Sequence, residues 1–293
     1  MTRVLRYAAI VLTTCAVAAC FAQETPTAVK NPKDQAWSVL YTGLGESNVP
    51  KRTTAVQVLG LLPDDTKATN AALKALKDDK PEVRAAAAQS LGDMKAKSAT
   101  EELYEMFNDN DAGVVIAAAR ALIALGDNRG YNVYYAVLTG ERKSGQGLKE
   151  EQKKMLNDPK KLAQFGFEQG IGFIPFAGLG YGAFKLVTKD TTSPVLAAAA
   201  LMLVKDPDPK SGQALANAAS GNKSWIVRAA ALNAIALRGE TSLLPAAESG
   251  LQDDKEEVRY SAAAAVIRLT DLRARRATAP KKAPARKPAS KKK

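Results

Sequence analysis

The segment DKPEVRAAAAQSLG, residues 79–92, decides the fold class. Val83, Ala87 and Leu91 stand four residues apart in it, which places them on one face of an α-helix. Pro81 precedes them at a point where a missing backbone N–H costs no helical hydrogen bond, and the intervening alanines are the strongest helix formers. The segment therefore predicts a helix that begins near Pro81 and buries its Val-Ala-Leu face.

The same three-point pattern occurs six times in the 293 residues, and its middle position is alanine in every copy. Consecutive copies begin 31 or 32 residues apart, except that 81 residues separate the third from the fourth. A second, weaker helical segment follows most copies, and the outlying interval equals one period plus an insertion of 50 residues. The spacing predicts three helix pairs, an insertion, and three more pairs. The other five copies are Lys51, Ala55, Leu59; Val114, Ala118, Leu122; Val195, Ala199, Leu203; Val227, Ala231, Ile235; and Val258, Ala262, Val266.

Two charged positions accompany the pattern. Arginine follows the first pattern residue in four copies, and an acidic residue stands five positions before it in five copies. The combined pattern Asp…Val-Arg-x-x-Ala-Ala…Leu-Gly resembles the short HEAT repeats, also called HEAT-like repeats, of bacterial proteins. The match is best at 79–92, recurs at 254–259, and covers roughly residues 35–135 and 190–270.

The resemblance implies an all-α fold: a right-handed α-α superhelix of about six helix pairs, with a helical insertion in the middle. Its second helices are expected to form a concave surface for protein partners. The charged positions are expected to form a structural ladder between repeats, made of Arg52, Arg84, Arg228, Arg259, Asp78, Asp109, Asp190 and Asp253. Val115 and Leu196 replace the arginine in the two copies beside the insertion, so we expect the ladder to be interrupted there.

The first 22 residues have the features of an export signal. Arg3 and Arg6 precede an uncharged, mostly apolar run, residues 7–19, which is too short to span a membrane. Small residues allow cleavage before Gln23 or after Ala18, whereas residues 17–20 resemble the lipobox of bacterial lipoproteins and would make Cys20 the lipid-modified first residue. We therefore expect an exported protein, either periplasmic, anchored to the envelope as a lipoprotein, or secreted, with a linker over residues 23–34.

The net charge of +12 comes from the two ends of the chain, because residues 7–272 sum to zero. Residues 273–293 contain ten basic residues, three prolines and no acidic residue, which predicts a disordered tail. Its composition resembles the tails of linker histones and favours binding to anionic lipid, glycan or nucleic acid, although the tail could also serve only solubility. The candidate polyanion-binding residues are Arg273, Arg275, Arg276, Lys281, Lys282, Arg286, Lys287, Lys291, Lys292 and Lys293.

The insertion, residues 140–189, has two unlike halves. Its first part is charged, whereas residues 169–184 carry no charge and are rich in glycine and aromatic residues, with Pro175 in their middle. Three interpretations remain open: a proline-broken helical hairpin packed on the repeats, a membrane contact at residues 165–187, and an exposed docking surface for a partner.

The residue inventory disfavours catalysis. The chain has no histidine, and both cysteines, Cys15 and Cys20, fall within the export signal. The commonest general base, the commonest metal ligand and a thiolate are thus missing from the rest of the chain. We predict no catalytic, cofactor or metal site, and a non-catalytic scaffold for protein–protein interaction in the bacterial cell envelope or exterior. The alternative is a polyanion- or membrane-surface-binding protein that acts through its basic tail.

Overall fold

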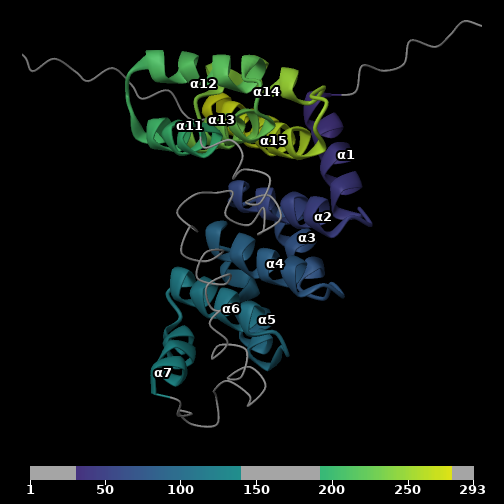
Figure 1. Ribbon diagram of the computed structural model, residues 1–293, viewed down its shortest axis with the longest axis vertical. Coiled ribbons are helices and arrows are strands. Elements are labelled where there is room, and N and C mark those ends of the chain that lie inside the picture. The colour runs from purple at the N-terminus through teal and green to yellow at the C-terminus, as the bar shows by residue number, and fades with distance from the viewer. Residues whose placement is uncertain (1–30, 140–191, 279–293) are drawn as a thin grey trace, which may run out of the picture. The chain divides into compact units, whose positions relative to one another are not determined.

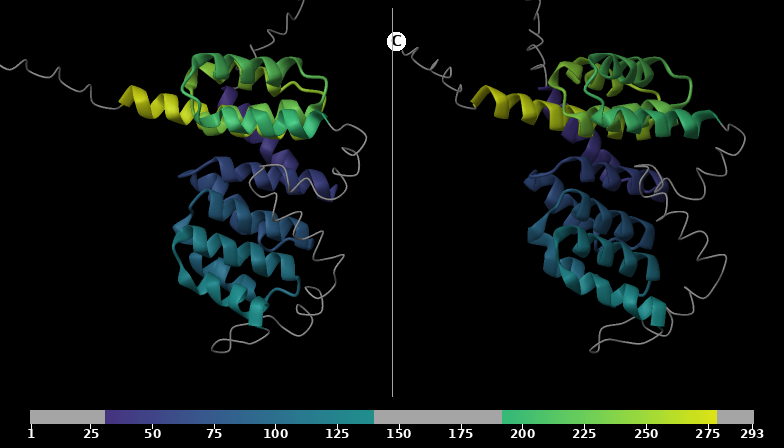
Figure 2. Two further views of the ribbon diagram at one scale, coloured as in Figure 1. Left: turned by 60° about the vertical axis from the view of Figure 1, so that its left-hand side comes forward. Right: turned by 90° about the vertical axis from the view of Figure 1, so that its left-hand side faces the viewer.

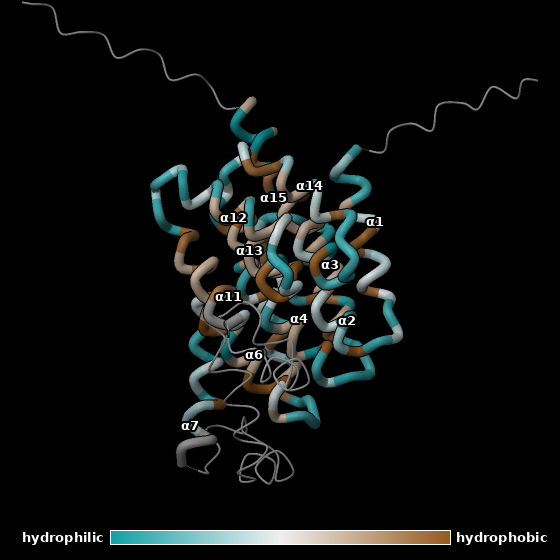
Figure 3. Tube along the Cα trace, turned by 45° about the horizontal axis from the view of Figure 1, so that its top comes forward, coloured by the Kyte–Doolittle hydropathy of each residue, from teal (hydrophilic) through white to brown (hydrophobic). Residues whose placement is uncertain are grey.

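A computed structural model describes residues 31–139 and 192–278, and all regular elements in these two segments are helical (Figure 1). The predicted all-α fold is confirmed. The predicted export signal with Cys20, the insertion with its stretch 165–187, and Lys281 to the end of the tail lie outside the described residues. The turns that join the helices are largely hydrophilic, whereas the apolar residues concentrate in the helices themselves (Figure 3).

The N-terminal segment holds the first three repeats. Their first helices are α2 (Val49–Gln57, extended by a 3₁₀ turn at Val58–Leu61), α4 (Pro81–Asp93) and α6 (Ala112–Leu125). Their second helices are α3 (Thr66–Ala75), α5 (Thr100–Glu105) and α7 (Tyr131–Thr139). One further helix, α1 (Pro32–Leu44), precedes them.

The C-terminal segment holds the other three repeats. Their first helices are α11 (Thr192–Met202), α13 (Trp225–Arg238) and α15 (Glu256–Thr278). Second helices follow the first two of these, as α12 (Pro209–Gly221) and α14 (Leu244–Gly250).

The alanine at the centre of the pattern marks the buried face in five copies. Ala55, Ala87, Ala118, Ala231 and Ala262 are all fully buried. In these copies a small side chain lets neighbouring helices approach closely, as the pattern predicted.

The fourth copy departs from this register. Ala199 is exposed in α11, and the buried positions are Ser193, Ala197 and Ala200. The prediction that Ala199 lies on the buried stripe was therefore wrong, whereas Leu203 is partly buried and packs against the core. The side chain of Val195 lies outside the described residues. Residues 197–200 are four consecutive alanines, so every face of this part of the helix carries a small residue. The sequence therefore does not determine which face is buried.

The repeats do not stack in the order of the sequence. The first helices pack in the row α11, α13, α15, α2, α4, α6, so that the sixth repeat adjoins the first (Figures 1 and 2). The helices α11 and α6, which flank the insertion in the sequence, are the two ends of this row. The insertion, which lies between the third and fourth repeats in the sequence, therefore joins the two helices that end this row.

Helix α1 supplies the second helix that the sixth repeat lacks. It packs on both α15 and α2. Gly43 stands twelve residues before Ala55, as Gly250 stands twelve residues before Ala262. A Cβ atom at Gly43 would lie 2.8 Å from the Ala55 Cβ, and one at Gly250 would lie 2.9 Å from the Ala262 Cβ. The contact of α1 with α2 therefore repeats the contact of α14 with α15.

Polar contacts cross the same junction between the sixth and first repeats. The Lys51 Nζ lies 2.6 Å from a Glu256 carboxylate oxygen, and Lys33 pairs with Asp271. The Arg268 side chain donates a hydrogen bond to the Leu61 carbonyl oxygen. Because these pairs link α15 to α1, α2 and the turn after α2, they fix the position of the N-terminal repeat on the C-terminal one.

Both predicted segment boundaries shift by a few residues. The Asn31 side chain accepts a hydrogen bond from the Lys33 backbone N–H and caps α1, so residues 32–34 of the predicted linker are helical. Helix α15 continues to Thr278, so the first six residues of the predicted disordered tail are helical as well. Arg275 pairs there with Asp64, and Arg276 donates to the Gly239 carbonyl oxygen. These contacts hold the end of α15 on neighbouring turns.

Candidate functional site: a groove between α1 and α3

Three of the predicted ladder arginines bind the acidic residue of the following repeat. The pairs are Arg52 with Asp78, Arg84 with Asp109, and Arg228 with Asp253, and each is bidentate, with N···O distances from 2.6 to 3.0 Å. Each arginine also donates to the backbone carbonyl oxygen six residues before it, at Glu46, Asp78 or Asn222. A single guanidinium therefore ties the turn of its own repeat to the turn of the next.

The environment of these pairs favours their charged forms. The carboxylate partner raises the pKa of Arg84 and of Arg228 by hydrogen bonding. Burial would raise the pKa of Asp253, but hydrogen bonds from Arg228 and from the Lys255 backbone N–H hold it below its ordinary value. Because all three guanidinium nitrogens of each arginine already donate hydrogen bonds within the protein, few N–H groups remain for binding an external anion.

The remaining predicted ladder residues behave differently. Arg259 donates to the Asp253 carbonyl oxygen and lies 3.3 Å from Glu256, and within the described residues no carboxylate of another repeat binds it. The expectation of a ladder rung at Arg259 was therefore wrong, and Lys51 makes the Glu256 pair across this junction instead. Val115, at the arginine position of the third copy, is buried in a small apolar cluster with Val133. Asp190 lies outside the described residues.

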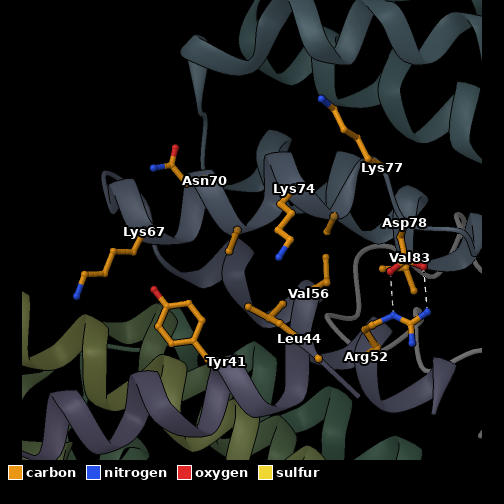
Figure 4. A pocket seen from close by; sticks show the side chains of 13 residues that line it. Tyr41, Leu44, Arg52, Val56, Lys67, Asn70, Lys74, Lys77, Asp78 and Val83 are labelled. Atoms are coloured by element: carbon orange, nitrogen blue, oxygen red, sulfur yellow. Dashed lines mark hydrogen bonds and ion pairs between the residues drawn. The ribbon is translucent and has the colours of Figure 1, made fainter. Parts of the chain in front are cut away.

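A groove of about 780 Å³ opens between α1 and α3 (Figure 4). Helix α2 and the start of α4 complete its walls, and apolar atoms make up most of its exposed lining. Tyr41 stands at its edge, half exposed, with its ring tilted by 31° against the Trp37 ring at a centroid distance of 5.4 Å. The lining residues are Tyr41, Leu44, Gly45, Arg52, Val56, Lys67, Asn70, Ala71, Lys74, Ala75, Lys77, Asp78 and Val83.

Three lysines give the groove an unbalanced positive charge. Lys67, Lys74 and Lys77 line it, all three are exposed, and none has an ion pair within the described part of the chain. Lys74 points toward Leu44 and Val56, whereas Lys77 points away from them (Figure 4). Asp78 is the one carboxylate among the described lining residues, and Arg52 already binds it. The groove therefore combines an apolar floor with cations that no carboxylate of the described residues neutralises.

Sequence reasoning did not find this groove, because one of its walls is α1, which carries no copy of the repeat pattern. One signal was present: α3 has Lys67 and Lys74 seven residues apart and contains no acidic residue. That spacing places both ammonium groups on one side of the helix.

Comparison with protein families identifies the class. The model that describes HEAT repeats matches residues 38–126 and 183–268, more than half of the chain. The chain belongs to the HEAT-repeat family, as its repeat pattern predicted. No curated protein matched the sequence.

Neither a membrane-spanning helix nor a metal-binding cluster is found among the described residues. Within 31–139 and 192–278, no helix combines the length and the apolar character that crossing a membrane requires. The same residues contain no cluster of three or more histidine, cysteine or acidic side chains arranged to hold a metal ion.

Proposed function

We propose that this chain is a non-catalytic scaffold that holds a protein partner in the groove between α1 and α3. HEAT repeats generally mediate protein–protein interaction, and their fold is typically non-catalytic. The observation that supports this site is the combination of an apolar floor with Lys67, Lys74 and Lys77, which have no ion pair among the described residues. Such a surface offers both buried area and charge to a partner.

The walls of the groove are held in place by contacts of their own. The Arg52–Asp78 pair, at Nε···Oδ2 2.9 Å, joins α2 to the turn before α4. The junction with α15 holds α1 through Lys33 and through the close fit of Gly43 against Tyr260. A groove that is already formed spares a partner the free-energy cost of ordering it.

The proposed setting is the cell envelope or exterior, supported by the basic and apolar residues of the segment 1–22 and by the basic composition of 279–293. In this setting the tail would attach the scaffold to anionic lipid, glycan or nucleic acid. Deleting residues 279–293 should weaken binding to anionic vesicles, DNA or envelope glycans at low salt and matter less at high salt. Unchanged binding to all three probes would count against a role of the tail.

Site-specific photo-crosslinking in living cells tests the scaffold. A photoreactive residue replaces Asn70, which lines the groove, and in a second strain it replaces Gln252, an exposed residue in the turn after α14. We expect a protein adduct, identified by mass spectrometry, at Asn70 and not at Gln252. Adducts at neither position, or equal adducts at both, would contradict a partner held in the groove.

A further inference from the structure

The charge and shape of the groove point to the chemistry of its ligand, and this inference rests on the proposed function. We infer that the groove binds a short acidic peptide segment that carries an apolar side chain between its carboxylates. The carboxylates pair with Lys67 and Lys74, and the apolar side chain packs on the floor formed by Leu44, Val56 and Ala71.

The positive charge of the groove lining indicates that the ligand is negatively charged. Lys67, Lys74 and Lys77 contribute three positive charges to the lining, against the single carboxylate of Asp78. The side chain of Asp78 is only 16% exposed and is bound through both oxygens by Arg52, so it does not neutralise the lysines. The Nζ of Lys67 lies 5.7 Å from the centroid of the Trp37 ring, which holds this ammonium group beside the mouth of the groove.

Helix geometry sets the length of the segment. Lys67 and Lys74 are seven residues apart in α3, which corresponds to about 10.5 Å along the helix axis. A peptide in the polyproline II conformation has three residues per turn and advances about 3.1 Å per residue, so carboxylates three residues apart lie on one side of it and span about 9.3 Å. The side chains between the two carboxylates point in other directions, so one of them can face the floor of the groove.

The surroundings favour a short peptide over a long polyanion. The second helix of the following repeat, α5, carries the exposed Glu102 and Glu105, which repel an anionic chain that continues past α3, whereas Glu101 is paired with Arg129. Nucleic acid also needs a row of cations, whereas the lining that the structure describes provides three lysines without an ion pair, placed around an apolar floor. A ligand with two or three negative charges and one apolar group meets both constraints.

The probe is a fluorescein-labelled peptide of sequence Gly-Glu-Leu-Ser-Glu-Gly, and its binding to the chain is followed by fluorescence anisotropy. The test variant is Lys67→Glu with Lys74→Glu. The matched control is Lys205→Glu with Lys210→Glu, two exposed lysines of the C-terminal repeats that also have no ion pair within the described residues. Both variants keep the basic tail, so any contribution from the tail is the same in each.

We expect the groove variant to raise the Kd at least about tenfold, which corresponds to the loss of about 1.4 kcal/mol, and the control variant to change it less than about twofold. A peptide with glutamine in place of glutamate should bind weakly to every variant. Equal losses in the two variants, tight binding of the glutamine peptide, or a DNA oligonucleotide that displaces the peptide from the groove would each overturn the inference. A partner crosslinked at Asn70 without binding of the acidic peptide would overturn the acidic specificity alone and leave the scaffold proposal standing.

Discussion

At the residue scale, the arginine of the repeat pattern explains how neighbouring repeats are held together. Arg228 contacts both oxygens of Asp253 and also the Asn222 carbonyl oxygen. The two side chains are only 12% and 11% exposed, so water screens their attraction poorly. Removing one partner leaves the other charge without compensation in a site that is largely closed to solvent.

Replacing Arg228 with alanine should therefore lower the free energy of unfolding by about 2–4 kcal/mol. The matched control is Arg273→Ala, which removes an exposed guanidinium from the last turns of α15 and should cost less than about 0.5 kcal/mol. Urea denaturation followed by circular dichroism measures both variants. Equal destabilisation by the two substitutions would show that the ladder pair adds nothing to the repeat interface.

The ladder carboxylates also predict how stability depends on acid. Burial alone would raise the pKa of Asp78 and Asp253, but hydrogen bonds from Arg52 or Arg228 and from a backbone N–H lower both below the ordinary value of 3.8. A depressed folded-state pKa stabilises the protein above the unfolded pKa, and this stabilisation is lost as the pH falls through the folded value. We expect the melting temperature to fall as the pH drops from about 5 to about 3, with a shallower fall in Arg228→Ala. If the melting temperature fell equally with pH in the wild type and in Arg228→Ala, the lowered pKa of Asp253 would not be a source of the acid sensitivity.

At the scale of the element, the sequence specifies first helices better than second helices. A first helix buries a stripe of Val, Ala and Leu at four-residue spacing, and this pattern located α4, α6, α13 and α15. Helix α1 lacks that stripe, and its place in the fold depends on the fit of Gly43 to another helix, which a local pattern does not reveal. The groove was not predicted for the same reason, since α1 forms one of its walls.

The fit of α1 can be tested at Gly43. A Cβ atom there would lie 2.6 Å from the Tyr260 ring and 2.8 Å from the Ala55 Cβ, so a larger side chain must push α1 away from both neighbours. Gly43→Leu should lower the free energy of unfolding by about 1–3 kcal/mol, as overpacking of a core does. It should also weaken peptide binding in the groove, because α1 is one of its walls.

Gly221→Leu is the control for this substitution. Gly221 also stands near the C-terminal end of a second helix, but an added Cβ would meet no atom within 4 Å. This variant should keep wild-type stability within about 0.5 kcal/mol. Similar losses at Gly43 and Gly221 in chemical denaturation would indicate that the cost comes from the helix end and not from the junction.

At the scale of the whole molecule, the sequence predicted the repeats but not their order. Each repeat contacts only its neighbours, so its stability depends on matching faces and not on adjacency in the sequence. Helix α15 contacts α1 through Tyr260 and Asp271 and contacts α2 through Glu256. Helices α6 and α11 stand at the two ends of the row of described first helices. These matching residues lie more than 200 positions apart, and repeat spacing alone gives no information about such pairs.

This order makes a prediction about separated halves of the chain. Expressed as two polypeptides, residues 31–139 and 192–278 should associate into a one-to-one complex. Each polypeptide alone would expose to water the surface that it buries at the junction between the sixth and first repeats. Tyr260, for example, is only 2% exposed in the intact fold. Analytical ultracentrifugation measures the association, and Gly43→Leu in the first polypeptide should weaken it at least about tenfold. The acidic peptide should bind the mixture more tightly than residues 31–139 alone, because α15 holds α1 in place beside α3. Halves that stay apart, or that associate equally well with Gly43→Leu, would contradict the packing of the sixth repeat on the first.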